Sequence, residues 1–189
     1  SSFILSQSDS IVQQEWAVTY SSQDSIYNSA TAIDVNGNVY VTGYTYTSTT
    51  SADITTIKYD DQGNLKWVKD FNGSGNGRDQ ATGICFDNLG NIYIGGFTTN
   101  DLGNYDYVVI KYDPAGNQLW FKIYDNGGSD MARAIACDQN NSVFLTGDSR
   151  GTSNQDCATV KYDDSGNLKW VERIDNGAND YGTDLILDA

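Results

Sequence analysis

The sequence predicts an all-β protein made of β-propeller blades, each a sheet of four antiparallel strands. The first observation is a repeat of about 50 residues: a segment that begins Lys-Tyr-Asp and continues through Gly-Asn to a tryptophan occurs three times, ending at Trp67, Trp120 and Trp170. The second is that short runs rich in Val, Ile and Tyr alternate with Asn-Gly or Gly-Asn turns. The third is that no segment has helical periodicity. Four short strands per unit of this length match a propeller blade.

Each repeat contains four expected strands in a fixed order. The first ends in an aspartate and leads into a tight turn, where Asn or Gly supplies the positive φ that hairpins need. The second is an apolar run, as expected for a strand covered on both faces, and a polar loop joins it to the third. The fourth carries the tryptophan after an Asp-x-x-Gly-Asn turn. The expected first strands are residues 30–34, 82–87 and 133–138, the second 39–43, 92–96 and 143–147, and the third 54–59, 107–112 and 157–162.

The repeats divide the chain into three full blades and two part-blades. The full blades are residues 21–71, 72–124 and 125–174; residues 1–20, with Phe3–Leu5 and Trp16, supply third and fourth strands, and residues 175–189 supply a first strand at 184–188. The chain opens at Ser1 rather than Met, which we interpret as a processed or excised product. Because unpaired sheet edges invite pairing, we expect a homo-oligomer or pairing with the remaining blades of a longer chain.

Composition excludes several classes of partner and of chemistry. The chain of 189 residues has a net charge of −14 and contains no histidine. Nucleic acids and anionic membranes bind basic patches, so neither is an expected partner. The missing histidine excludes His-based catalytic triads, general bases and metal ligands. No run approaches the roughly 20 apolar residues of a membrane span, so we expect no membrane insertion.

Three ten-residue segments carry a resemblance. Asp34–Gly43, Asp87–Gly96 and Asp138–Gly147 follow the form Asp-x-x-Gly-Asn-Val-Tyr-Val-Thr-Gly, with an altered turn in the third. They resemble the seven-bladed β-propeller repeat family of bacterial secreted and cell-surface proteins. The resemblance implies the propeller fold and a secreted or cell-surface location. For function we expect a non-enzymatic scaffold for binding or assembly, with a protein or glycan partner. The alternatives are a propeller enzyme of hydrolase, lyase or quinoprotein type with its site at the channel mouth, and the sensor domain of a longer signalling protein.

Repeated positions are expected to serve the architecture. We predict that the three tryptophans are buried between blades. Lys58, Lys111 and Lys161 each precede an aspartate by two residues, which predicts an ion pair on one face of an outer strand. Cys85, Cys137 and Cys157 occupy strand positions that are apolar in most copies. We therefore expect small buried apolar residues there rather than a disulfide or a reactive thiol.

Ligand-binding residues are expected where the copies differ. The loops between second and third strands, residues 44–53, 97–106 and 148–155, vary in sequence while the tight turns do not. Tyrosine with Ser, Asn and Asp is a usable composition for contacting glycan or protein. Tyr44, Tyr46, Tyr105 and Arg150 are the candidate ligand-binding residues, and the sequence offers no candidate catalytic residue.

One set of carboxylates is a candidate cation site. Asp79, Asp130 and Asp180 precede the first strands by the same spacing, in loops expected near the channel mouth, where a ring of carboxylates could hold calcium. The alternative is that each accepts backbone N–H bonds within its own Gly-rich loop. The aspartates that end the first strands, Asp34, Asp87 and Asp138, are expected to form Asx turns. Apart from that calcium, we expect no cofactor.

Overall fold

The computed structural model describes residues 17–18, 20, 25–46, 51–151 and 154–188. Their regular structure consists of twelve strands in three four-stranded antiparallel sheets, which confirms the predicted all-β class. No helix among them is long and apolar enough to cross a membrane. The strands are β1 (Ser25–Ile33), β2 (Val39–Tyr46), β3 (Asp53–Tyr59) and β4 (Leu65–Phe71); β5 (Gln80–Phe86), β6 (Ile92–Thr99), β7 (Tyr105–Tyr112) and β8 (Gln118–Tyr124); β9 (Asp130–Cys137), β10 (Val143–Arg150), β11 (Gln155–Tyr162) and β12 (Leu168–Ile174).

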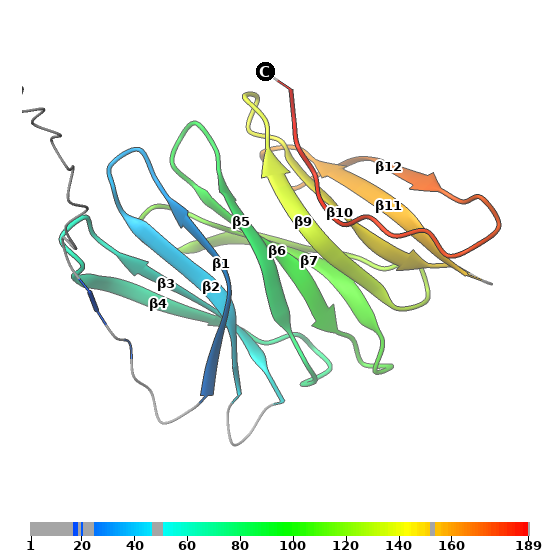
Figure 1. The fold of residues 1–189 in the computed structure, drawn as a ribbon, viewed down its shortest axis with the longest axis horizontal. Coiled ribbons are helices and arrows are strands. Elements are labelled where there is room, and N and C mark those ends of the chain that lie inside the picture. The colour runs from blue at the N-terminus through cyan, green and yellow to red at the C-terminus, as the bar shows by residue number, and fades with distance from the viewer. Residues whose placement is uncertain (1–16, 19, 21–24, 47–50, 152–153, 189) are drawn as a thin grey trace, which may run out of the picture.

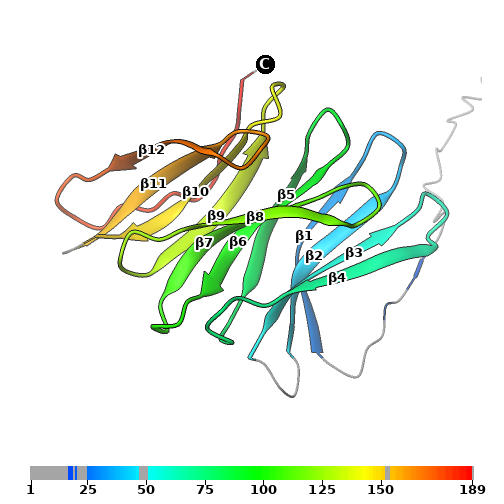
Figure 2. The same ribbon diagram turned by 180° about the vertical axis from the view of Figure 1, so that it is seen from behind.

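The three sheets follow chain order and lie side by side in a row (Figures 1 and 2). We call them the first, second and third blades. Within each blade, every strand pairs with the next one along the chain, so β1 and β4, or their counterparts, form the edges. Each strand expected in the three full blades is present, and the first strands begin two to five residues earlier than the sequence pattern indicates.

A glycine at the same place in every second strand explains part of the repeat. The first strand of each blade pairs with the second through a bulge, which brings its backbone close to that glycine. A Cβ on Gly43, Gly96 or Gly147 would lie 1.9, 2.0 or 2.1 Å from a carbonyl oxygen of the first strand. Only glycine therefore fits, because no side chain can occupy that space.

The apolar core consists of two clusters, one between each pair of neighbouring blades. Tyr40 and Ile54 of the first blade pack with Ile92, Ile94 and other residues of the second. Tyr93 and Tyr107 of the second blade pack likewise with Val143, Leu145 and Val160 of the third. The core is thus divided between neighbours, as in other repeat arrays.

The prediction of buried tryptophans is wrong for the third copy. Trp67 and Trp120 are half-buried against the neighbouring blade, whereas Trp170 is 38% exposed. The first two pack on the β7–β8 and β11–β12 turns of the blades that follow them. No following blade is present among the described residues, so Trp170 keeps its exposure.

The predicted lysine ion pairs are also wrong. Lys111 and Lys161 lie 3.4 Å from Asp87 and Asp138, the aspartates that end the first strands of their own blades. The aspartate two residues after each lysine instead lies in the next turn, where Asp113, for example, binds the amide of Asn117 at 2.8 Å. The third strand is an interior strand of its blade, and Lys58 and Lys111 are buried.

Two of the three cysteines form a disulfide, which corrects the prediction of separate small apolar residues. Cys85 on β5 is bonded to Cys137 on β9, so the innermost strands of the second and third blades are covalently joined. The two positions differ by one residue in the repeat, and successive residues of a strand point to opposite faces. Cys85 therefore faces the third blade while Cys137 faces back. Cys157 is a free, half-buried thiol.

The C-terminal segment does not form the predicted strand. Residues 175–188 contain no regular structure, and Gly182 packs against Thr146 and Gly147 of the third blade. Among the described residues no second strand is available to pair with residues 184–188. The predicted strands within residues 1–16 lie outside the described residues.

Candidate functional site

The aspartates of the tight turns are used by the backbone, as the sequence predicts. Asp34 Oδ1 accepts the N–H groups of Asn36 and Asn38 at 2.9 and 3.0 Å, and Asp87 and Asp138 make the same Asx turn. In the β3–β4 turn, the side-chain amide of Asn64 and nearby backbone N–H groups hold the pKa of the Asp60 carboxyl below its usual range. These carboxylate oxygens accept hydrogen bonds from the turn itself, so the Asx turn is sufficient to explain the recurring aspartates.

The predicted cation ligands lie at the end of the blades that carries the loops between second and third strands. Asp79 and Asp130 lie where β5 and β9 begin, and Asp180 lies at the equivalent place in the C-terminal segment. Asp79 accepts N–H bonds from Gly73 and Thr99 and a hydroxyl bond from Thr98. Asp130 accepts the N–H groups of Asn126 at 2.7 Å and Arg150 at 3.0 Å. Asp180 binds both nitrogens of Asn176. All three carboxylates therefore brace their own loops, which is the alternative that the sequence left open.

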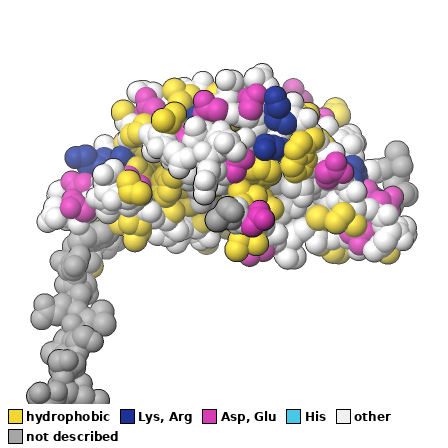
Figure 3. Space-filling model, turned by 90° about the horizontal axis from the view of Figure 1, so that it is seen from above, with side chains coloured by type: hydrophobic (Ala, Val, Ile, Leu, Met, Phe, Trp, Pro, Cys, Tyr) yellow, Lys and Arg dark blue, Asp and Glu magenta, His cyan; other side chains and the backbone are white. Residues whose placement is uncertain are grey.

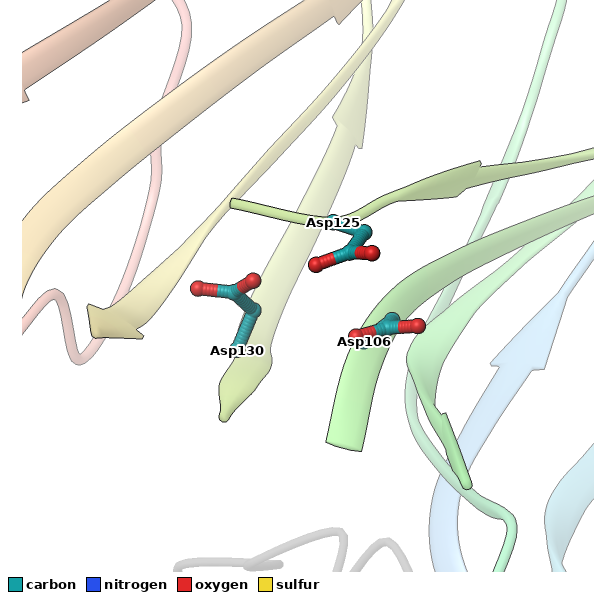
Figure 4. Close-up of side chains that lie close together, drawn as sticks. All are labelled: Asp106, Asp125 and Asp130. Carbon is teal, nitrogen blue, oxygen red and sulfur yellow. The ribbon is translucent and has the colours of Figure 1, made fainter. Parts of the chain in front are cut away.

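Asp130 and Asp180 belong to two separate carboxylate clusters. Among the described residues, the groups of three acids that come within 4.8 Å of one another are Asp106, Asp125 and Asp130, where the second blade meets the third, and Asp156, Asp175 and Asp180, where the third blade meets the C-terminal segment. Figure 4 shows the first group, with one member from β7, one after β8 and one from β9. Asp79 joins neither group. Sequence analysis missed the other four members, although they recur at the same spacing.

The two clusters differ in their nearest cation. In the third blade, the guanidinium of Arg173 donates to Asp156 Oδ2 at 2.6 Å, and also to Ser149 and the Tyr124 hydroxyl. The residue at the same position in the second blade is Ile123, since Ile123 pairs with Val108 as Arg173 pairs with Ala158. Burial, together with the carboxylates of Asp125 and Asp130, raises the pKa of Asp106 to about 6.

The predicted ligand-binding tyrosines belong to an aromatic strip at the loop end of the first two blades. Tyr44 stacks on Tyr27 of β1 at 5.0 Å between ring centroids, and Tyr46 meets both rings edge-on at 5.6 and 5.8 Å. Tyr27 and Tyr46 are 48% and 40% exposed. We call Tyr27, Tyr44, Tyr46, Arg78, Phe97 and Tyr105 the aromatic strip.

Arg78 connects the two halves of the strip. Its guanidinium carbon lies 5.5 Å from the ring centroid of Tyr44 and 5.9 Å from that of Phe97, within the range of cation–π contacts. Phe97 in turn meets Tyr105 edge-on at 5.0 Å. The sequence indicated Tyr44, Tyr46 and Tyr105, but not Tyr27, Arg78 or Phe97. Tyr27 pairs with Tyr44 across β1 and β2, and this pairing follows from the strand register, which the sequence alone does not give.

Arg150 lies apart from the strip in the third blade. It is exposed at the end of β10 and lines a polar hollow of about 310 Å³ with Asn154, Gln155 and Asn179. At the position of Tyr44, the third blade has Asp148, which is ion-paired with Arg133 at 2.5 Å. The three copies thus differ in chemistry at the loop end, as predicted. On the face shown in Figure 3, acidic side chains are scattered among apolar and basic ones.

Comparison with known proteins supports the fold and little more. No family model matches the chain. It is similar to an uncharacterized WD repeat-containing protein of Acanthamoeba polyphaga mimivirus, with 29% identity over 108 residues. The match covers 48% of this chain and 8% of the viral protein, so the chain spans a small part of that protein's length. A WD-repeat relative and three four-stranded blades fit a β-propeller-like repeat fold.

Proposed function

We propose that this chain is a non-enzymatic β-propeller scaffold that binds a protein partner through the aromatic strip. The observation that carries the proposal is a continuous row of side-chain contacts that crosses from the first blade to the second. It begins with the rings of Tyr46, Tyr27 and Tyr44 and continues through Arg78 and Phe97 to Tyr105. Tyrosine and arginine are, with tryptophan, the residues enriched at the energetic hot spots of protein interfaces.

The surroundings of the strip support the same proposal. The rings are held by neighbours on regular strands and by Arg78, so little side-chain entropy would be lost on binding. The WD-repeat relative agrees with a scaffold role. We further propose a secreted or cell-surface location, which the Cys85–Cys137 disulfide supports because disulfides persist in oxidising compartments.

The proposal is tested with defined probes. A peptide library displayed on phage and a glycan array would be offered to the folded protein, and the affinity of the selected ligands measured for Tyr27→Ala and Tyr46→Ala variants. We expect peptides to be selected and each substitution to weaken binding by about 2 kcal/mol. Gln62→Ala and Ser165→Gly, in the turns at the other end of the blades, are the matched controls.

Two results would overturn the proposal. Selected peptides whose affinity falls for the turn variants but not for the tyrosine variants would place binding at the turns between third and fourth strands, at the end of the blades opposite the aromatic strip. Ligands found on the glycan array alone would show that the strip recognises sugar rings rather than protein.

A further inference from the structure

In each contact between neighbouring blades, a tryptophan and a lysine of one blade donate hydrogen bonds to the same backbone carbonyl of the next blade. Trp67 Nε1 and Lys58 Nζ both donate to the carbonyl oxygen of Pro114, at 3.4 and 3.0 Å. One blade further on, Trp120 Nε1 and Lys111 Nζ both donate to the carbonyl of Asp164, at 3.1 and 3.2 Å. Pro114 and Asp164 each follow the first aspartate of an Asp-x-x-Gly-Asn turn. A blade therefore recognises the turn between the third and fourth strands of its neighbour.

The indole ring also recognises the glycine of that turn. Gly116 has φ +86°, and a Cβ there would come within 3.0 Å of the Trp67 ring. Gly166 has φ +77°, and its Cβ would come within 3.1 Å of the Trp120 ring. A residue with a side chain would be strained by the positive φ and would also push the indole away. The recognised element is thus one carbonyl and one glycine at fixed positions.

The third blade presents the same donors without an occupant among the described residues. We call Phe144, Lys161, Trp170 and Ile174 the outer face of this blade. Ile174 is 64% exposed, whereas Phe71 at the same place in the first blade is 8% exposed. Lys161 lies 3.4 Å from Asp138 and 4.6 Å from the Phe144 ring centroid. No carbonyl from the described residues lies within hydrogen-bond range of the Trp170 indole N–H.

A hollow lies where the turn of a further blade would fit. It has a volume of about 410 Å³ and is bordered by the β9–β10 turn, Phe144 and the end of the C-terminal segment. Figures 1 and 2 show that the third blade stands at one end of the row. Among the described residues, no further blade packs beside Phe144.

We propose that the outer face binds a β-hairpin of another blade through an Asp-x-x-Gly-Asn turn. The residue after the aspartate places its carbonyl between Lys161 Nζ and Trp170 Nε1, and the glycine lies under the indole. The two interfaces within the chain carry this assignment, because the outer face continues them with the same residue types at the same register.

The charge of the outer face limits which residues the partner turn can carry beside its glycine. Lys69 and Lys122 extend over Gly116 and Gly166, and the corresponding residue of the third blade is Glu172. The partner turn therefore has neutral or basic residues beside its glycine. The turn Asp113–Asn117, with Pro114 and Ala115 at its variable positions, meets this requirement.

The test uses a backbone-cyclised peptide of residues 105–124, which contains that turn, and the isotope-labelled full chain. The indole N–H signals of its four tryptophans are followed by NMR, with that of Trp170 assigned from Trp170→Phe. We expect saturable binding that moves the Trp170 signal downfield, as a new hydrogen bond does, and leaves those of Trp67 and Trp120 in place. Lys161→Met should weaken binding about tenfold, which corresponds to about 1.4 kcal/mol.

The controls separate recognition from loss of fold. Lys169→Met removes an exposed lysine from β12, the strand that carries Trp170, and should leave binding unchanged. The peptide with Gly116→Val should not bind. The unchanged Trp67 and Trp120 signals report that each variant is folded. Absence of any shift at Trp170 would overturn the proposal, as would binding that Lys161→Met leaves intact, or a Trp170 shift caused by self-association of the chain without peptide.

Discussion

The second and third blades carry equivalent carboxylate clusters that are neutralised in different ways. In the third, Arg173 reaches across to Asp156 and is itself held by Ser149 and Tyr124. In the second, Ile123 stands in the place of the arginine, and the buried Asp106 has its pKa raised to about 6, by burial first and then by its acidic neighbours. The two clusters thus differ at one strand position, which holds an arginine beside one cluster and an isoleucine beside the other.

Removing the arginine should have the largest effect. Arg173→Met leaves Asp156 buried beside Asp175 and Asp180 without its cation, and we expect unfolding by urea to show a loss of roughly 3 to 5 kcal/mol. Lys169→Met, which breaks an exposed pair with Asp163, is the control and should cost less than about 1 kcal/mol. Equal losses for the two variants would mean that the arginine does not neutralise the cluster.

The second blade should give the opposite pH dependence from an ordinary aspartate. The pKa of Asp106 is about 6 in the folded chain, compared with 3.8 for an unperturbed aspartate, so the folded state binds the proton more tightly than the unfolded state. Its contribution to stability is complete below pH 3.8 and is lost as the pH rises through 6, by no more than about 3 kcal/mol.

Asp106→Asn isolates that contribution. The variant should flatten the decline in stability between pH 4 and pH 6 and be more stable than the parent at neutral pH. Asp113→Asn is the control: hydrogen bonds from Asn117 lower the pKa of Asp113, so its contribution is present above the unfolded pKa and lost as the pH falls. An unchanged pH profile in Asp106→Asn would show that the cluster keeps no proton.

Placing an arginine in the second blade should bring the two clusters closer together in behaviour. Ile123→Arg is expected to gain up to about 1 kcal/mol at neutral pH, because Ile123 is 42% exposed and loses little apolar burial. The decline in stability near pH 6 should shrink as well. Ile123→Gln, similar in length and uncharged, is the control, and an equal gain from it would rule out neutralisation as the cause.

Calcium should have the smallest effect. The oxygens of Asp130 already accept backbone N–H groups, and Asn100 donates to both oxygens of Asp106, so the cluster of Asp106, Asp125 and Asp130 offers few free ligand positions. We expect the melting temperature to stay constant on addition of calcium or of a chelator. An ion at 100 times its dissociation constant would add about 2.7 kcal/mol, which a rise of several degrees would reveal.

The sequence was sufficient for the blades because their determinants are local and repeated. Asx turns and apolar second strands recur with the period, and both form as expected. Contacts between blades could not be predicted in the same way. Cys85 on β5 and Cys137 on β9 align one residue apart in the repeat. An alignment of the copies therefore gives no sign that the two side chains face each other. Lys58 bonds to Pro114 in another blade, which no spacing within one repeat could indicate.

The candidate sites were predictable in part for the same reason. Tyr44 and Tyr46 stood out because the loops differ between copies, while Arg78 reaches the Tyr44 ring from the second blade. The acidic clusters combine residues from a third strand, the end of a fourth strand and the start of the next blade. The repeated aspartates that the sequence indicated therefore include one member of each group, Asp130 and Asp180, and one residue, Asp79, that belongs to neither.

The disulfide between β5 and β9 has a consequence for how the molecule comes apart. A row of blades that touch only their neighbours can lose order from either end, much as a one-dimensional lattice does. The bond between Cys85 and Cys137, 52 residues apart, lowers the entropy of the unfolded chain by an amount worth about 4 kcal/mol. The second and third blades should therefore melt as one cooperative unit. The first blade, held to them by packing of Tyr40, Ile54 and Trp67, becomes the place where amide exchange and proteolysis begin.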